Sequence, residues 1–262
     1  METVSFICTV FNHSPELVQR MINSVNKAML YRLEFNYDFL IINNGEQDYT
    51  SLKTIDGDTR GLLTIVDTGS NLGYCGGNNI GISKSNAEFI FIINPDIIIT
   101  NSLCIDWMVG SSKLNHSVSG WMIGTNEWYT YASTFPTASK YEPDLLPFYP
   151  TEPTLEKTGR WKAFRYIDGS FMCFPRALAI DIDGFDEDIF PGYFGENVFC
   201  FKAFLAGYKI DNVPCKDFYE HKHGKRTSEY ESQIHTWSKL GRQLFYEKYA
   251  LRNWDKFIEY LN

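Results

Sequence analysis

Two short polar segments early in the chain have residue types that could bind a charged ligand. The first, Asn71–Ile82, reads Asn-Leu-Gly-Tyr-Cys-Gly-Gly-Asn-Asn-Ile-Gly-Ile, and the second is Asn94-Pro95-Asp96. A glycine-rich turn lets the backbone approach a ligand closely. A carboxylate at the end of the apolar stretch that separates the segments can hold a divalent cation against phosphate groups. Together the two segments indicate a nucleotide-sugar site.

The first segment resembles the Asn-Leu-Gly-aromatic-x-Gly-Gly-Asn-x-Gly signature of glycosyltransferase family 2. Within that family the chain most resembles the bacterial rhamnosyltransferase-like branch, in which Asn-Pro-Asp stands where other GT-A enzymes carry a metal-binding Asp-x-Asp. Two further blocks occur in the family's order, Ile167–Met172 and then Gly184–Glu187 through Gly195–Asn197 to Gly207-Tyr208. Four ordered blocks across about residues 3–228 are far more specific than any one of them.

This resemblance implies a GT-A-like α/β fold, a Rossmann-like and mostly parallel sheet flanked by helices. Residues 1–228 would form the GT-A domain, with a nucleotide-sugar-binding half at 1–127 and an acceptor-binding half at 128–228. A helical C-terminal tail would follow at 229–262. One departure concerns catalysis, because the family normally has Glu-Asp where this chain has Glu196-Asn197.

The first half of the chain also reads, from its residues alone, as alternating strands and helices. Four apolar runs predict strands, at Thr3–Val10, Tyr37–Ile42, Leu62–Val66 and Glu88–Ile93. Helix-like segments lie between them, and Ser14-Pro15-Glu16 supplies the cap, first-turn proline and early negative charge that begin a helix. Sheets of this kind bind ligands beyond the carboxyl ends of their strands, so we expect the site there.

Donor recognition is expected at the ends of the first strands. The resemblance places Thr9, Val10 and Phe11 near the base, and Asn43 where the family often has an aspartate that accepts a hydrogen bond from a pyrimidine imide. An asparagine can accept through its oxygen but can also donate, so the identity of the base stays open. The remaining expected donor-binding residues are Asn71, Gly73, Tyr74, Gly77, Asn79 and Asn94.

A divalent cation, Mn²⁺ or Mg²⁺, is the expected cofactor. The net charge of −8 means that a diphosphate would meet an acidic protein, so a cation is the natural neutraliser, and nucleic acid is an unsuitable partner. Asp96 is the expected carboxylate ligand. The resemblance adds a late histidine, for which His221 fits better than His223, although the segment around them also reads as a basic surface loop.

The acceptor is expected against the second half of the chain. Asp168, Gly169 and Ser170 read as a turn beside the donor sugar, and Asp186 and Glu187 as carboxylates on a rigid corner. A capped turn explains both segments equally well. Between residues 128 and 161, five prolines among Tyr and Phe indicate a long irregular excursion, either a binding lid or a surface insertion.

The catalytic base is expected at Glu196 or at the position of Asn197. The family assigns this role to the aspartate that Asn197 replaces, and an amide cannot accept the proton. Three explanations stay open: Glu196 has taken over the role, a natural aspartate was deliberately changed to trap a complex, or the protein binds without catalysing. Glu196 also lies at the start of a helix-like segment, where a carboxylate favours the helix dipole in any case.

The C-terminal tail has two readings. Apolar residues recur at helical spacing with Lys and Arg among them, as in a helix that lies on a membrane surface. Packing onto the preceding domain explains the same stripe, and we favour it. The residues of the stripe are Ile234, Trp237, Leu240, Leu244, Phe245 and Tyr249.

Composition adds expectations about location. The six cysteines show no C-x-x-C pair, so neither a zinc site nor a disulfide framework is indicated, and a reducing cytoplasm is the simplest compartment. No signal peptide and no membrane-spanning run is evident. A cytoplasmic enzyme, with peripheral membrane contact through its tail as an option, fits this pattern.

The sequence therefore predicts an inverting glycosyltransferase. Its donor would be dTDP-rhamnose or a UDP-sugar, and its acceptor a glycan or lipid-linked oligosaccharide in surface polysaccharide assembly. A catalytically silent nucleotide-sugar-binding relative and a nucleotidyltransferase are the alternatives. The second is weaker, because Thr9–Asn12 lacks the glycine- and basic-rich loop that such enzymes carry.

Overall fold

The computed structural model describes residues 1–54, 60–123, 166–222 and 228–261. Within them a seven-stranded sheet has the strand order β3-β2-β1-β4-β7-β6-β8. The four strands at the β3 end are parallel, β7 runs antiparallel to both neighbours, and β8 is parallel to β6. The strands are β1 (Glu2–Val10), β2 (Phe35–Asn43), β3 (Leu62–Asp67), β4 (Phe89–Ile93), β6 (Ser117–Ile123), β7 (Tyr166–Pro175) and β8 (Lys209–Asn212).

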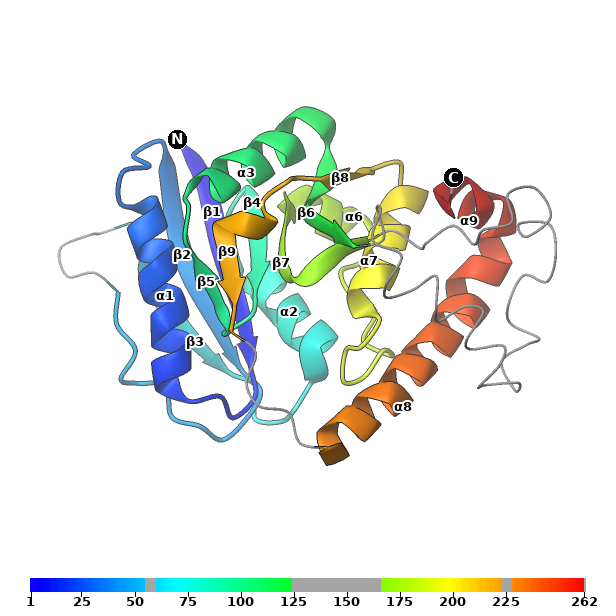
Figure 1. Ribbon diagram of the computed structural model, residues 1–262, viewed down its shortest axis with the longest axis horizontal. Helices are drawn as coiled ribbons and strands as arrows, with labels where there is room; N and C mark the ends of the chain where they lie inside the picture. Colours follow the sequence, from blue (N-terminus) through cyan, green and yellow to red (C-terminus); the bar gives the residue numbers. More distant parts are fainter. Residues whose placement is uncertain (55–59, 124–165, 223–227, 262) are drawn as a thin grey trace.

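Helices cover both faces of this sheet (Figure 1). Alternate residues of a strand point to opposite faces, so Phe6 and Phe91 belong to one core, with α1 and α3, while Ile7 and Ile92 belong to the other, with α2, α6 and α7. The helices are α1 (Pro15–Met29), α2 (Gly73–Lys84), α3 (Leu103–Asn115), α6 (Arg176–Asp181) and α7 (Gly195–Leu205). The predicted α/β architecture is confirmed.

The predicted N-terminal elements agree closely with the structure. The four predicted strands correspond to β1, β2, β3 and β4, and α1 begins at Pro15 with the hydroxyl of Ser14 accepting a hydrogen bond from the Leu17 amide. The expectation of a helix between β2 and β3 is not met in the described residues, since 44–54 and 60–61 form turns and irregular backbone.

The glycine-rich run is a helix, contrary to the expected turn. Only Asn71 and Leu72 precede the helix, and α2 begins at Gly73, whose φ is +69. Its glycines serve close helix-to-sheet packing: a Cβ at Gly77 would lie 2.3 Å from Thr9 Cγ2, and one at Gly81 would lie 2.3 Å from Ile7 Cγ2. Glycine is therefore needed here for the approach of α2 to β1.

A second correction concerns residues 168–170, which were expected to form a turn. They lie inside strand β7, where Asp168 Oδ1 accepts a hydrogen bond of 2.9 Å from the Ser170 amide. Asp and Gly favour turns for local reasons, and these residues lie where the register between β6 and β7 shifts, between the paired residues 166–167 and 172–173.

The C-terminal segment packs onto the domain. It consists of α8 (Ser228–Phe245), a π-helical turn η3 (Tyr246–Ala250), a short 3₁₀ turn η4 (Leu251–Asn253) and α9 (Trp254–Leu261). Phe245 and Phe257 are fully buried in the same core as Phe201 of α7. This is the packing that we favoured for the tail. Across the described ranges we find no helix with the length and hydrophobicity needed to span a bilayer.

Candidate functional site

The carboxyl ends of the parallel strands meet at one edge of the sheet, as the sequence predicted. Val10 pairs with Asn43, and Asn43 pairs with Asp67, so the last residues of β1, β2 and β3 lie side by side. Beyond β4, the amide of Asn94 donates a hydrogen bond of 2.8 Å to the Ser170 carbonyl. Three of the expected donor residues, Val10, Asn43 and Asn94, therefore follow or end strands at this edge.

Asn43 has its side chain fixed by neighbouring loops. Its Nδ2 donates to Asp67 Oδ1 at 2.8 Å and to the Gln47 carbonyl at 2.9 Å, while its Oδ1 accepts from the Gly45 amide at 3.1 Å. Both N–H groups are thus used, and only the oxygen retains accepting capacity for a ligand. Asp67, an exposed carboxylate beside it, was not among the predicted residues.

The other expected donor residues surround the start of α2. Thr9 Oγ1 donates to Asn78 Oδ1 at 2.8 Å, Val10 is fully buried, and Phe11 keeps half of its surface exposed. Asn71 Oδ1 accepts from the Gly73 amide at 2.9 Å, which closes the turn before the helix. The exposed aromatic face of Phe11 is open to a ligand and of a kind that can stack on a base.

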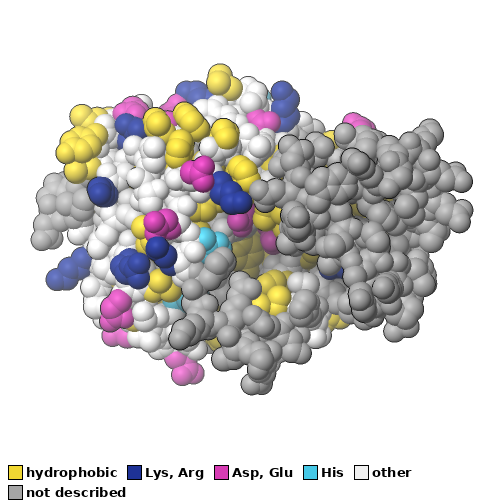
Figure 2. All heavy atoms as spheres, in the orientation of Figure 1, with side chains coloured by type: hydrophobic (Ala, Val, Ile, Leu, Met, Phe, Trp, Pro, Cys, Tyr) yellow, Lys and Arg dark blue, Asp and Glu magenta, His cyan; other side chains and the backbone are white. Residues whose placement is uncertain are grey.

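Asp96 and His221 lie together, as expected for a cation site. A small antiparallel sheet joins β5 (Ile97–Ile99) to β9 (Tyr219–His221), pairing Ile97 with His221. His221 Nε2 is 3.2 Å from Asp96 Oδ2, and both side chains are partly exposed. Figure 2 shows histidine and acidic side chains beside a hollow near the middle of one face. His223 lies outside the described residues.

The fit to a cation is partial. Among the described residues there is no group of three or more His, Cys, Asp or Glu side chains arranged to hold a metal. Asp96 and His221 supply one carboxylate and one imidazole, and Mg²⁺ is usually held by one or two carboxylates together with substrate phosphates and water. This pair therefore fits an ion whose coordination a bound diphosphate completes.

His13 is a neighbour of Asp96 that the sequence did not single out. Burial lowers the pKa of His13, and the negative charge of Asp96 opposes this shift. Its Nδ1 accepts a hydrogen bond of 3.1 Å from the Phe11 amide, so the imidazole is held at the end of β1. A histidine three residues beyond a strand end gave no motif by which to recognise it.

Glu196 occupies the first turn of α7, where β7 and α2 converge. A Cβ at Gly169 would lie 3.0 Å from Glu196 Cβ and 2.9 Å from the Tyr74 hydroxyl, so this glycine allows the three segments to meet. Tyr74 donates its hydroxyl hydrogen to the Gly169 carbonyl at 2.7 Å. Burial, aided by the charge of Asp168, raises the pKa of Glu196 from 4.5 to about 7.

Asn197 is almost fully buried, with 1% of its surface exposed, and its Nδ2 has no hydrogen-bond partner in the described structure. The hydroxyl of Ser170 is also buried without a partner there. Buried polar groups are normally paired, so unpaired ones often mark a place where a ligand or water binds. Asn197 directly follows Glu196, and Ser170 directly follows Gly169, which lies against Glu196.

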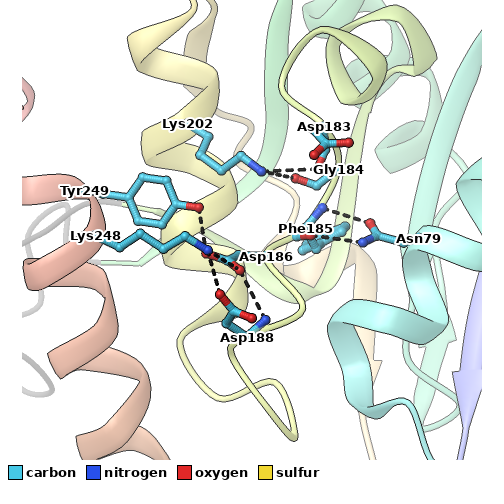
Figure 3. Close-up of polar contacts among 9 residues, drawn as sticks. All are labelled: Asn79, Asp183, Gly184, Phe185, Asp186, Asp188, Lys202, Lys248 and Tyr249. Atoms are coloured by element: carbon cyan, nitrogen blue, oxygen red, sulfur yellow. Dashed lines mark hydrogen bonds and ion pairs between the residues drawn. The ribbon is translucent and has the colours of Figure 1, made fainter.

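Side-chain hydrogen bonds fix the corner at Gly184–Glu187 (Figure 3). Asn79 exchanges hydrogen bonds with the backbone of Phe185, at 2.8 and 2.9 Å, and donates to Glu187 Oε1 at 2.8 Å. Asp186 is buried and accepts from Tyr249 and Lys248. These contacts hold the corner in place, and the expected roles of Asn79 toward a donor and of Asp186 and Glu187 toward an acceptor stay predictions.

Comparison with solved structures identifies the fold. TarS from S. aureus superposes with a TM-score of 0.56 at 18% identity, over 89% of this chain and 38% of that chain. The same protein truncated to residues 1–349 has been solved with UDP-GlcNAc, and it matches with a TM-score of 0.55 at 17% identity, over 99% of this chain and 79% of that one. The mannosyltransferase PcManGT from Pyrobaculum calidifontis, solved with GDP-Man and Mn²⁺, gives 0.51 at 13% identity, covering 98% and 84%.

Sequence comparison identifies the family. A curated relative, the low-salt glycan biosynthesis hexosyltransferase Agl10 of Haloferax volcanii, is 28% identical over 147 residues, which are 54% of this chain and 46% of that protein. The chain thus matches about half the length of this relative. The model of "Glycosyl transferase family 2" matches residues 5–167, which include β1 through the start of β7. The chain therefore belongs to glycosyl transferase family 2.

Proposed function

We propose that this protein is an inverting glycosyltransferase that moves a sugar from a nucleotide diphosphate donor to a hydroxyl group of a glycan or lipid-linked oligosaccharide. Family membership supports the reaction class. The observation that carries the proposal is Glu196, a half-buried carboxylate at the head of α7 whose pKa is raised to about 7. General bases work best when their pKa lies near the operating pH.

In this mechanism Glu196 takes the proton of the acceptor hydroxyl as its oxygen attacks the anomeric carbon. The bond from that carbon to the diphosphate breaks on the opposite side, so the configuration inverts. Partial burial of Glu196 beside Tyr74 and Gly169 weakens the solvation of the carboxylate and makes it a stronger base than it would be in solution. Asp168 adds negative charge nearby, which acts in the same direction.

The departing diphosphate would accumulate negative charge, and in this proposal Asp96 and His221, 3.2 Å apart, would hold a cation against it. A bound cation would stabilise that charge. This role predicts that Asp96→Ala abolishes the metal-dependent part of nucleotide affinity while the fold is retained. Calorimetry that finds unchanged affinity in the variant, with and without Mn²⁺, would remove Asp96 from the site.

The donor is proposed to be dTDP-rhamnose or a UDP-sugar. The rhamnosyltransferase-like motifs favour the first, whereas the related solved proteins were crystallised with UDP-GlcNAc or GDP-Man. The carbonyl oxygen of Asn43 can accept from the imide N–H that uracil and thymine share, since its amide group is already engaged. Pyrimidine donors are therefore preferred in this proposal.

A second candidate is a catalytically silent relative that binds a nucleotide sugar. Asn197 favours it, because this residue stands where the family normally has its base. The intact Glu196 environment favours catalysis instead.

A ligand panel separates the two. Thermal shift with UDP, GDP, dTDP and their sugar derivatives, with and without Mn²⁺, identifies the donor, because a ligand at ~100 times its dissociation constant stabilises by about 2.7 kcal/mol. Release of nucleoside diphosphate from the donor so identified supports the enzyme. Binding without any release supports the silent relative.

A further inference from the structure

The loop that leads into α7 connects the corner to Glu196. We define it as residues 186–194, and name it the α7 loop; it begins at Asp186 and ends at Phe194, directly before Gly195 and Glu196. Any shift of its last residues therefore moves the first turn of α7, and Glu196 with it. The contacts that hold this loop are consequently of interest for the reaction.

The start of the loop is held by the C-terminal segment. Tyr249, in η3, donates its hydroxyl hydrogen to Asp186 Oδ2 at 2.6 Å (Figure 3). Lys248 bridges Asp186 and Asp188, with its Nζ 2.9 Å and 2.8 Å from their Oδ2 atoms. Burial acts to raise the pKa of Asp186, but the bonds from Tyr249 and Lys248 outweigh it and lower that pKa, so the carboxylate stays charged and paired.

The end of the loop is held by α8. A Cβ at Gly241 would lie 2.2 Å from the Tyr193 carbonyl oxygen and 2.9 Å from Phe194 Cβ, so the helix touches the backbone of the loop at this point. One turn earlier on α8, the ring of Trp237 stacks on that of Tyr193, with centroids 5.8 Å apart and an interplanar angle of 19°. These contacts lie within three residues of Glu196 in sequence.

The middle of the loop rests on α2. The Pro191 carbonyl accepts from the Tyr74 amide at 2.6 Å, and a Cβ at Gly192 would lie 2.3 Å from Tyr74 Cβ. Tyr74 in turn bonds to Gly169 beside Glu196. The α7 loop is thus enclosed between the start of α2 and the C-terminal segment.

We propose that the C-terminal segment is a positioning element of the transfer site, in which Gly241, Lys248 and Tyr249 hold the α7 loop so that Glu196 meets the acceptor hydroxyl. This inference rests on the proposed function. The C-terminal segment would thus act on the transfer step. Donor binding would depend on the strand ends instead, because the contacts of Gly241, Lys248 and Tyr249 described above are all with the α7 loop.

Two variants with a matched control test this role. Gly241→Ala places a methyl group against the Tyr193 carbonyl and displaces the loop. Tyr249→Phe removes one hydroxyl and leaves the aromatic packing in place, so it is expected to fold even if the first variant does not. The control is Gly110→Ala in α3, since a Cβ there meets no atom within 4 Å.

Hydrogen exchange of the amides of the α7 loop and steady-state release of nucleoside diphosphate are measured on the full chain. We expect faster exchange in the loop for Gly241→Ala and Tyr249→Phe, with kcat lowered about 10- to 100-fold. The donor KM should stay within about twofold, and the acid limb of the pH profile should move to lower pH as water reaches Glu196. Gly110→Ala should match the unmodified protein in all of these.

Three results would overturn the proposal: loop exchange that is unchanged in both variants, faster exchange with an unchanged kcat, or a loss that falls on the donor KM alone. Absence of nucleoside diphosphate release from every nucleotide sugar tested would instead refute the proposed function. The exchange data would then still decide whether the C-terminal segment holds the loop, so the two failures are distinguishable.

Discussion

At the scale of single residues, chemistry depends on which side chains the fold brings beside Glu196. The sequence shows that Glu196 lies at the start of a helix. It does not show that the pKa of Glu196 is raised, because the residues that bury this side chain, Tyr74 and Gly169, lie far away in the chain. The same holds for Asp186, whose Lys248 partner is 62 residues away. Local patterns assign such residues to turns or ligands, since only tertiary contacts reveal their partners.

The raised pKa of Glu196 predicts a pH dependence of transfer. The base must be deprotonated to act, so kcat/KM should rise with pH and level off above about 7. Asp168→Asn removes a nearby negative charge that raises the pKa of Glu196, so the rise of kcat/KM should occur at lower pH in this variant. A pH profile of donor consumption in both proteins tests this, and a limb that remains near the ordinary glutamate value of about 4.3 would contradict it.

At the scale of elements, strands β1 to β4 and helix α1 are predictable because their apolar runs and the Ser14 cap are local signals. A helix between β3 and β4 was expected, but its formation by the glycine-rich run was not, because glycines favour turns and lower helix propensity. Packing decides its form, since Gly77 and Gly81 let the helix lie directly against Thr9 and Ile7 of β1. Residues Asp168-Gly169-Ser170 likewise lie inside β7, at the shift in its register with β6, which their local turn preference does not reveal.

The packing of α2 predicts an unequal cost for two similar substitutions. Gly81→Ala would place a methyl group 2.3 Å from Ile7 Cγ2, an atom of a fully buried side chain that cannot move away. Overpacking of this kind costs about 1–3 kcal/mol, which outweighs the gain in helix propensity. Gly110→Ala in α3 meets open space and should be neutral or stabilising. Urea unfolding of both variants gives the comparison, and equal stabilities would refute the account of α2.

At the scale of the whole molecule, the tail is part of the domain. The helical spacing of its apolar residues predicted a helix, but it could not distinguish a membrane surface from a protein surface, since both bury the same stripe. The structure favours the protein surface, because Phe245 lies against Phe194, Phe201 and Phe257 in a common core. The excursion at 128–161 lies outside the described residues, so both of its readings, a lid and a surface insertion, stay predictions.

Two substitutions on α8 test this packing. Phe245 is 1% exposed, and Phe245→Ala should cost about 3–5 kcal/mol because it leaves a cavity in the core. Leu240, which is 51% exposed on the same helix, should tolerate alanine within about 0.5 kcal/mol. Thermal unfolding resolves this difference. If both substitutions changed stability equally little, or if the intact protein floated with anionic liposomes, the results would favour a helix that lies on a membrane surface.

The most direct test of the central claim compares Glu196→Gln with Asn197→Asp in transfer from the donor that the ligand panel identifies. If Glu196 is the base, its amide variant should lose about 10²–10⁴-fold in kcat with unchanged donor binding, whereas Asn197→Asp should change kcat little. Full activity in Glu196→Gln, or a gain of orders of magnitude in Asn197→Asp, would contradict the assignment of the base to Glu196.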